Sequence, residues 1–94
     1  GKFAYAANSN STNLSGYAIN ATSGALSAIT GSPFNGGTAP WSVNAAASGK
    51  FVYLANYLSN NVWTYSVDAT TGALTAVGTP IATAQSPTSI TTTP

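Results

Sequence analysis

The 94-residue chain has almost no charge and contains no histidine or cysteine. Lys2, Lys50 and Asp68 are its only charged side chains. Nucleic-acid binding depends on clustered lysine and arginine that neutralise phosphates, and anionic membrane surfaces attract the same kind of cluster. The sequence therefore predicts no nucleic-acid partner. No apolar run approaches the length of a transmembrane segment, so we also expect no membrane insertion.

These absences also restrict the catalysis that the chain can perform by itself. Without cysteine there is no disulfide, no thiol nucleophile and no thiolate metal ligand. Ester hydrolysis needs a general base, an electrophile or a metal, and Asp68 is the single carboxylate side chain. Asp68 precedes a turn, where a side-chain acceptor for backbone N–H groups is the simpler interpretation. We therefore expect a non-catalytic protein with no metal and no cofactor.

Serine, threonine, asparagine and glycine supply the polarity that charge does not. Because 44% of the residues are hydrophobic, disorder is excluded as an explanation for this composition. A chain rich in these polar residues and poor in charge is typical of secreted and cell-surface proteins, so we expect an extracellular location. Asn10, Asn13 and Asn20 each begin an Asn-x-Ser/Thr sequence, which makes them candidate glycosylation sites.

The chain consists of a sequence repeat. Residues 1–8 (GKFAYAAN) return as residues 49–56 (GKFVYLAN), a shift of 48 positions. Residues 20–26 (NATSGAL) return as residues 68–74 (DATTGAL) in the same register. Beyond them one deletion changes the shift to 47, and the prolines that follow again align. A period in the forties, filled with short β-type runs, indicates a β-propeller blade.

Each repeat predicts short strands separated by turns. The expected strands are residues 2–8, 14–20, 26–30, 41–47, 50–56, 62–68, 74–78 and 88–93. Several of them carry apolar side chains on both faces, as in residues 51–54 (FVYL). A free antiparallel sheet leaves one face polar, whereas blades packed face to face around an axis bury both faces. The predicted fold is therefore all-β, with two four-stranded antiparallel propeller blades.

The block of residues 49–56, followed by Asn60-Asn61-Val62 and residues 69–74 (ATTGAL), resembles the YVTN-type bacterial propellers. These include lactonase-like seven-bladed proteins related to 6-phosphogluconolactonase. The resemblance covers essentially the whole chain and implies blades that run outward from an inner strand. Residues 1–40 would then hold strands two to four of one blade, residues 41–87 a complete second blade, and residues 88–94 a further first strand. The charged and histidine residues expected in active members have no counterparts here.

Two blades do not close a ring, so the offset between repeat and chain predicts association with further copies. We expect head-to-tail strand donation, which yields a closed ring or a filament. The donated strand would comprise Thr88, Ser89, Ile90, Thr91 and Thr92, and the accepting edge Phe3, Tyr5 and Ala7. The predicted function is therefore a structural, self-assembling propeller module whose partners are copies of itself.

Two alternative functions remain open at this stage. In a carbohydrate-binding propeller, Trp41 and Trp63 would stack on sugar rings, with Asn8 and Asn56 as polar contacts. Packing between blades is the competing interpretation for both tryptophans. In the second alternative the chain is a fragment of a lactonase-like enzyme whose catalytic residues lie in other blades.

Overall fold

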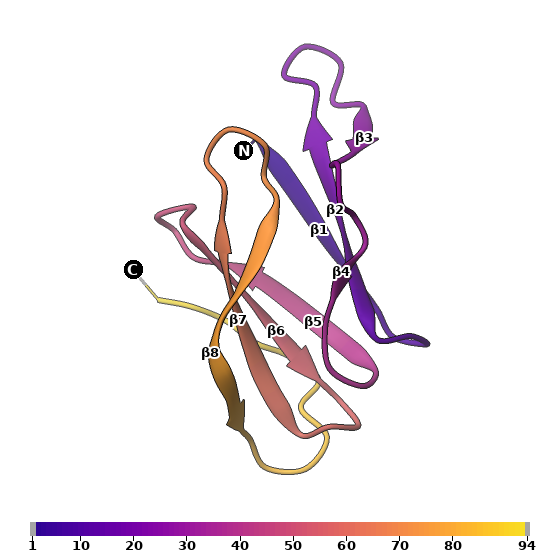
Figure 1. The fold of residues 1–94 in the computed structure, drawn as a ribbon, viewed down its shortest axis with the longest axis vertical. Helices are drawn as coiled ribbons and strands as arrows, with labels where there is room; N and C mark the ends of the chain where they lie inside the picture. The colour runs from indigo at the N-terminus through magenta and orange to yellow at the C-terminus, as the bar shows by residue number, and fades with distance from the viewer. Residues whose placement is uncertain (1, 94) are drawn as a thin grey trace.

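The computed structural model describes residues 2–93, which form two four-stranded antiparallel sheets (Figure 1). The first contains β1 (Phe3–Asn8), β2 (Asn13–Ile19), β3 (Leu26–Ala28) and β4 (Phe34–Asn35). The second contains β5 (Pro40–Ala45), β6 (Phe51–Asn56), β7 (Asn61–Val67) and β8 (Leu74–Ala82). The predicted all-β fold of two antiparallel blades is confirmed. Among these residues no helix is long and apolar enough to cross a membrane.

The order of strands in the second sheet follows the chain, so that blade is built from successive hairpins, whereas in the first sheet β3 and β4 both pair with β2. The second sheet has the order β5-β6-β7-β8, and the first has the order β1-β2-β3, with β4 also paired to β2. β1 packs beside β5, which places the two sheets next to each other. The predicted first blade (residues 1–40) begins at Gly1 and the predicted last strand (residues 88–94) ends at Pro94. Gly1 and Pro94 lie outside the described residues.

The repeated turn after β2 and β7 has the same structure in both blades. The Asn20 side-chain oxygen accepts hydrogen bonds from the backbone N–H groups of Thr22 (2.9 Å) and Ser23 (3.0 Å). In the second blade the Asp68 carboxylate accepts the corresponding bonds from Thr70 (2.8 Å) and Thr71 (2.9 Å). Gly24 and Gly72 complete these turns with φ angles of 76° and 78°, which glycine adopts without a steric penalty.

The outer strands of the two blades differ, and the sequence-based bounds were wrong there. The strand expected over residues 26–30 ends at Ala28, and pairing with β2 resumes only in β4. The interruption follows from the extra residue of the first repeat, which is taken up by a turn at Gly31, where φ is 94°. In the second blade β8 continues past the expected end at residue 78 to Ala82, and a register irregularity opposite Val62 and Thr64 keeps it paired.

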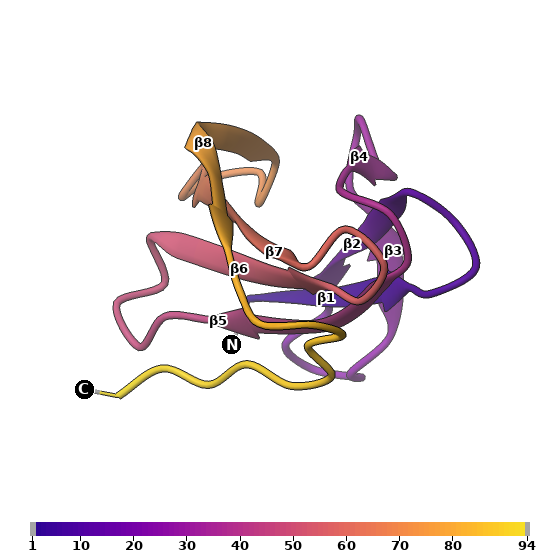
Figure 2. The same cartoon turned by 90° about the horizontal axis from the view of Figure 1, so that it is seen from below.

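Residues 88–93 form no strand, contrary to the sequence-based expectation. They run past β5 as an extended segment (Figure 2), and the Thr92 hydroxyl donates a 3.0 Å hydrogen bond to the side-chain oxygen of Asn44. The physical reason is the lack of a partner: a first strand pairs with the second strand of its own blade, and residues 2–93 contain no such strand for this segment. Pairing of Thr88, Ser89, Ile90, Thr91 and Thr92 with another sheet stays a prediction.

The core lies where the two sheets meet. Its buried members come from both blades and are Leu14, Val52, Leu54, Tyr65 and Leu74. Two tyrosine hydroxyls cross between the blades in opposite directions. Tyr5 donates to the carbonyl oxygen of Gly72 (2.7 Å), and Tyr65 donates to that of Asn35 (2.6 Å). Burial raises the pKa of both tyrosines, so both hydroxyls keep the proton that they donate.

We predict that Gly72→Ala destabilises the protein more than Gly24→Ala, although both glycines occupy the same turn. Each substitution places a side chain at a positive φ and costs about 1–2 kcal/mol. At position 24 the new Cβ meets no atom within 4 Å, whereas at position 72 it would lie 2.5 Å from Cδ1 of Phe3, across the blade interface. Urea unfolding of both variants measures the difference, and equal losses would contradict the packing of this turn on the first blade.

Candidate functional site

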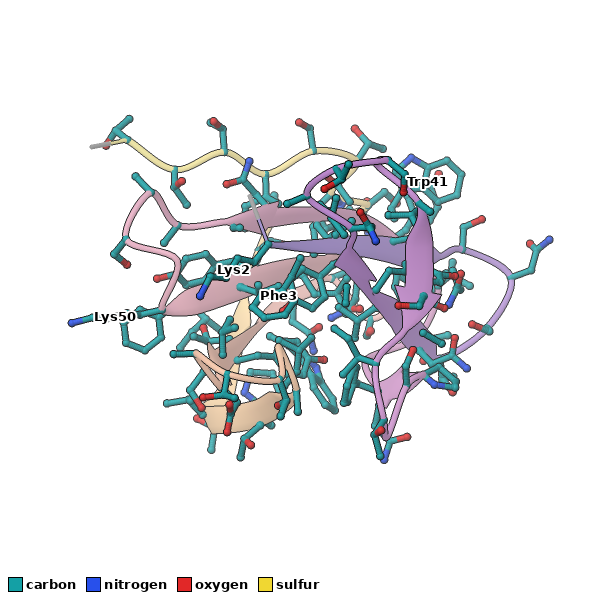
Figure 3. All side chains as sticks on the ribbon, turned by 90° about the horizontal axis from the view of Figure 1, so that it is seen from above. Lys2, Phe3, Trp41 and Lys50 are labelled. Carbon is teal, nitrogen blue, oxygen red and sulfur yellow. The ribbon has the colours of Figure 1, made fainter. Side chains whose placement is uncertain are left out.

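The two ends of the blades differ in charge. One end carries the turns at residues 20–25, 46–50 and 68–73, and here Lys2 and Lys50 precede β1 and β6 while Asp68 follows β7. We call this the lysine end. The opposite end carries the turns and loops at residues 9–12, 36–39, 57–60 and 83–86. We call it the tryptophan end because Trp41, the second residue of β5, lies there. Figure 3 shows both lysines far from Trp41.

Trp41 occupies an irregular position at the start of β5. Pro40 is opposite Asn56 and Ser42 is opposite Ala55, so Trp41 is an extra residue without a partner in β6. Such a bulge redirects a side chain out of the regular alternation of a strand. The Trp41 side chain is 49% exposed and stacks against Tyr57, with ring centroids 4.9 Å apart and an angle of 33° between the planes.

Hydrogen bonds of Asn56 hold the backbone next to this aromatic pair. Asn56 is fully buried, and its side-chain N–H donates to the side-chain oxygen of Asn61 (3.0 Å). Its own side-chain oxygen accepts from the backbone N–H of Gly37 (3.2 Å). A Cβ at Gly37 would lie only 2.6 Å from the Asn56 side chain, so the loop needs glycine at this close approach. Asn56 thereby joins the end of β6 to the loop that connects the blades.

Backbone bonds extend the same connection. The N–H of Tyr57 donates to the carbonyl of Ala39 (2.9 Å), and that of Leu58 donates to the carbonyl of Thr38 (3.2 Å). The N–H of Thr38 in turn donates to the Ser59 hydroxyl (2.8 Å). Residues 36–39 and 57–60 therefore form one hydrogen-bonded unit, which holds Trp41 and Tyr57 in place.

The four residues predicted to contact a ligand do not come together in one site. Asn56 lies opposite Pro40 at the tryptophan end, but its side chain is buried and accepts a hydrogen bond from Gly37. Asn8 belongs to the other blade, where its side-chain N–H donates to Asn13 (2.7 Å) and Ser15 (3.0 Å). Trp63 lies on β7 and lines a groove between the blades, and its buried indole N–H has no partner within residues 2–93. A role for these residues in carbohydrate binding stays a prediction.

Sequence reasoning missed Tyr57 and Leu58, which adjoin Trp41. A signal for both was present in the repeat, because their counterparts 48 positions earlier are Ser9 and Asn10. Residues 57–60 form a turn in which polar side chains are the rule, so these two apolar side chains depart from it.

The remaining predicted residues have structural contacts of their own. Phe3 packs against Gly72, and Tyr5 donates to the Gly72 carbonyl, so these side chains of the expected accepting edge face the second blade. Ala7 packs against the core. Of the candidate glycosylation sites, Asn10 and Asn20 are exposed and Asn13 is half-buried within a hydrogen-bonded turn. Strand pairing at this edge and glycosylation both stay predictions.

Comparison with known proteins decides the family. Residues 1–92 match the family described as lactonase, 7-bladed β-propeller. The chain belongs to this family. Among curated proteins, this lactonase-family chain has no match.

Two solved structures resemble the lactonase-family chain, and both are named "putative 6-phosphogluconolactonase". The one from Bacteroides fragilis NCTC 9343 has 23% sequence identity and a TM-score of 0.85, and the match covers 95% of this chain and 24% of that one. The one from Bacteroides uniformis ATCC 8492 has 27% identity and a TM-score of 0.78, covering 88% of this chain and 24% of that one. The chain thus spans about a quarter of each.

These findings correct the functional prediction made from composition. The expectation of a non-catalytic, self-assembling structural module is contradicted, because the family and both structural neighbours are lactonase-related. The lactonase-like fragment, held open above as an alternative, fits better. The lack of a general base and the near absence of charge are properties of these 94 residues alone. The two neighbours are about four times as long. The comparisons do not support assembly into a filament or a structural role, and an extracellular location stays a prediction.

We predict that Asn56→Ala costs more stability than Asn8→Ala, its counterpart in the repeat. Removal of the Asn56 amide leaves the N–H of the half-buried Gly37 without its acceptor, which costs about 1–3 kcal/mol. Asn8 is half-buried and its amide donates only to side chains, of which Asn13 also accepts a hydrogen bond from Ser11. Urea unfolding of both variants, with amide exchange at Gly37 as a local probe, tests this. A larger loss for Asn8→Ala would contradict it.

We predict that Asp68→Asn preserves the fold and removes one acid-sensitive contribution to stability. The N–H groups of Thr71 and Thr70 lower the pKa of Asp68 from its ordinary value of 3.8. A carboxyl whose pKa is lower in the folded than in the unfolded state stabilises the fold above the unfolded pKa and loses this effect as pH falls through the folded pKa. The variant should therefore lose less stability than the parent below about pH 4 in urea unfolding series. Asn20 shows that asparagine makes the same turn.

Proposed function

We propose that the chain forms two neighbouring blades of a seven-bladed propeller enzyme that hydrolyses a sugar lactone. The observation that carries this proposal is the family match over residues 1–92. The substrate class is inferred from the name 6-phosphogluconolactonase that both structural neighbours carry, which refers to a phosphorylated gluconolactone.

Lactone hydrolysis defines what the complete site must supply. Water adds to the carbonyl carbon, the bond from that carbon to the ring oxygen breaks, and the ring oxygen leaves as a hydroxyl that carries one proton. The product is an open-chain hydroxy acid. A general base must accept a proton from the attacking water, and hydrogen-bond donors must stabilise the oxyanion.

We assign this proton transfer to residues outside the 94 positions of the chain. The only carboxylate side chain, Asp68, lies in a turn at the lysine end, and its oxygen already accepts two backbone hydrogen bonds. Those bonds lower its pKa, which makes the carboxylate a weaker base. Tyr5 and Tyr65 donate their hydroxyl protons to carbonyls of the opposite blade and have raised pKa values, so neither supplies a base.

The contribution of these two blades is a rigid wall of the site. The hydroxyls of Tyr5 and Tyr65 fix one blade against the other, and the unit of residues 36–39 and 57–60 fixes the tryptophan end. The exposed Trp41 ring at that end supplies contact area without charge. Positioning by such rigid elements lowers the entropic cost of bringing substrate and catalytic groups together.

The test is hydrolysis of 6-phosphogluconolactone and of unphosphorylated glucono-δ-lactone by the closed propeller that contains residues 1–94. Each turnover releases one carboxylic acid, so alkali uptake at constant pH follows the reaction. We expect a rate well above spontaneous ring opening, and we expect the 94-residue chain to give only the spontaneous rate because it has no free base. A closed propeller that does not accelerate either reaction would overturn the proposal.

A further inference from the structure

Three apolar side chains at the tryptophan end depart from the repeat. The counterpart of Trp41 is Thr88, 47 positions later, and the counterparts of Tyr57 and Leu58 are the polar Ser9 and Asn10. Positions that build the blade, such as the paired tyrosines, turn glycines and strand-end asparagines, are the same in both copies. The fold of a blade therefore does not require an aromatic pair at this end.

Burial in the core does not explain these side chains either. Trp41 is 49% exposed and Leu58 is 62% exposed, and Tyr57, which stacks against Trp41, is half-buried. The bulge at Trp41 turns its ring away from the pairing with β6. The hydrogen bonds from Tyr57 and Leu58 to Ala39 and Thr38 hold the surrounding backbone rigid. The result is an exposed aromatic surface that is ordered before any ligand arrives.

We propose that Trp41 and Tyr57 form a platform that binds one face of a neutral sugar ring, and that in the complete propeller this ring is the sugar lactone. The choice of ligand rests on the proposed function. The face of an aromatic ring attracts C–H groups, which a pyranose or lactone ring presents on its faces. All three charged side chains lie at the opposite, lysine end, so this surface offers no charge for an ionic group.

The arrangement assigns different roles to the polar groups around the platform. Asn56 and Ser59 are already engaged in holding the loop of residues 36–39, so they act as positioning residues. Trp41, which is the more exposed of the two side chains, contacts the sugar ring, and Tyr57 packs against Trp41. Selectivity for a ring over an open chain follows, because only a ring presents a flat set of C–H groups.

The experiment is a fluorescence titration with D-glucono-δ-lactam, a neutral ring analogue of the lactone that does not open in water. The titration uses the 94-residue chain with Trp63→Phe, in which Trp41 is the only tryptophan and reports on its own surroundings. We expect the emission of Trp41 to change in a saturable way with the lactam, and not with sodium gluconate, its open-chain acid.

Two variants test the platform itself, with binding followed by calorimetry. Trp41→Thr restores the residue found in the other repeat and should weaken lactam binding by about tenfold, the effect of losing one aromatic contact of about 1.4 kcal/mol. Trp41→Phe keeps an aromatic face and should retain most of the affinity. Because Trp41 is half exposed, both variants should unfold within a few degrees of the parent, which thermal unfolding checks.

The outcomes separate this inference from the proposed function. Absence of lactam binding, equal binding of gluconate, or unchanged affinity in Trp41→Thr would overturn the platform, even where the closed propeller hydrolyses lactones. Lactam binding that depends on Trp41 in a propeller without hydrolytic activity would uphold the platform and overturn only the enzyme. Binding of detergent-like apolar molecules in preference to the lactam would point to a protein partner and would also overturn the sugar site.

Discussion

The contact between the two blades is the constraint on which the rest of the structure depends. Neither sheet has enough buried surface of its own, and the core cluster draws its members from both. The hydroxyls of Tyr5 and Tyr65 cross this contact in opposite directions and satisfy carbonyls that would otherwise be left unpaired there. One bond anchors the inner part of the first blade to a turn of the second, and the other anchors the second blade to the outer strand of the first. Together they join the two blades at two separate places.

Much of this fold could be predicted because both copies of the repeat contain the same pattern of strand and turn residues. Alternating side chains set the strands, and the identical turns after β2 and β7 depend on a side-chain acceptor followed by glycine, as the pairs Asn20 with Gly24 and Asp68 with Gly72 show. What could not be predicted depends on partners distant in sequence. The single extra residue in the first repeat breaks its outer strand at Gly31, whereas Gly78 leaves β8 continuous. Residues 88–93 have strand-like composition but lack a sheet to join.

The candidate site was predictable only in part. Trp41 stood out as a tryptophan where the other repeat has threonine, but its exposure depends on a bulge that no local pattern indicates. Asn56 was considered as a polar contact for a ligand, but it is fully buried and accepts a hydrogen bond from the loop of residues 36–39. The prediction of a non-enzyme failed for a different reason. Composition reports only on the residues present, and this chain spans about a quarter of each of the two solved structures that it resembles.

Comparison of the two copies of the repeat distinguishes structural from functional side chains better than composition does. A closed propeller must satisfy the same packing and hydrogen bonds at every blade, so the residues that do this work recur, as Tyr5 recurs at Tyr53 and Asn8 at Asn56. A ligand, by contrast, meets different blades with different parts of its own surface. Side chains that differ between blades while remaining exposed and rigid are therefore the ones to examine for recognition. In this chain that criterion selects Trp41 and Tyr57 and leaves Trp63 to the groove between the blades, where packing against Tyr65 accounts for its ring.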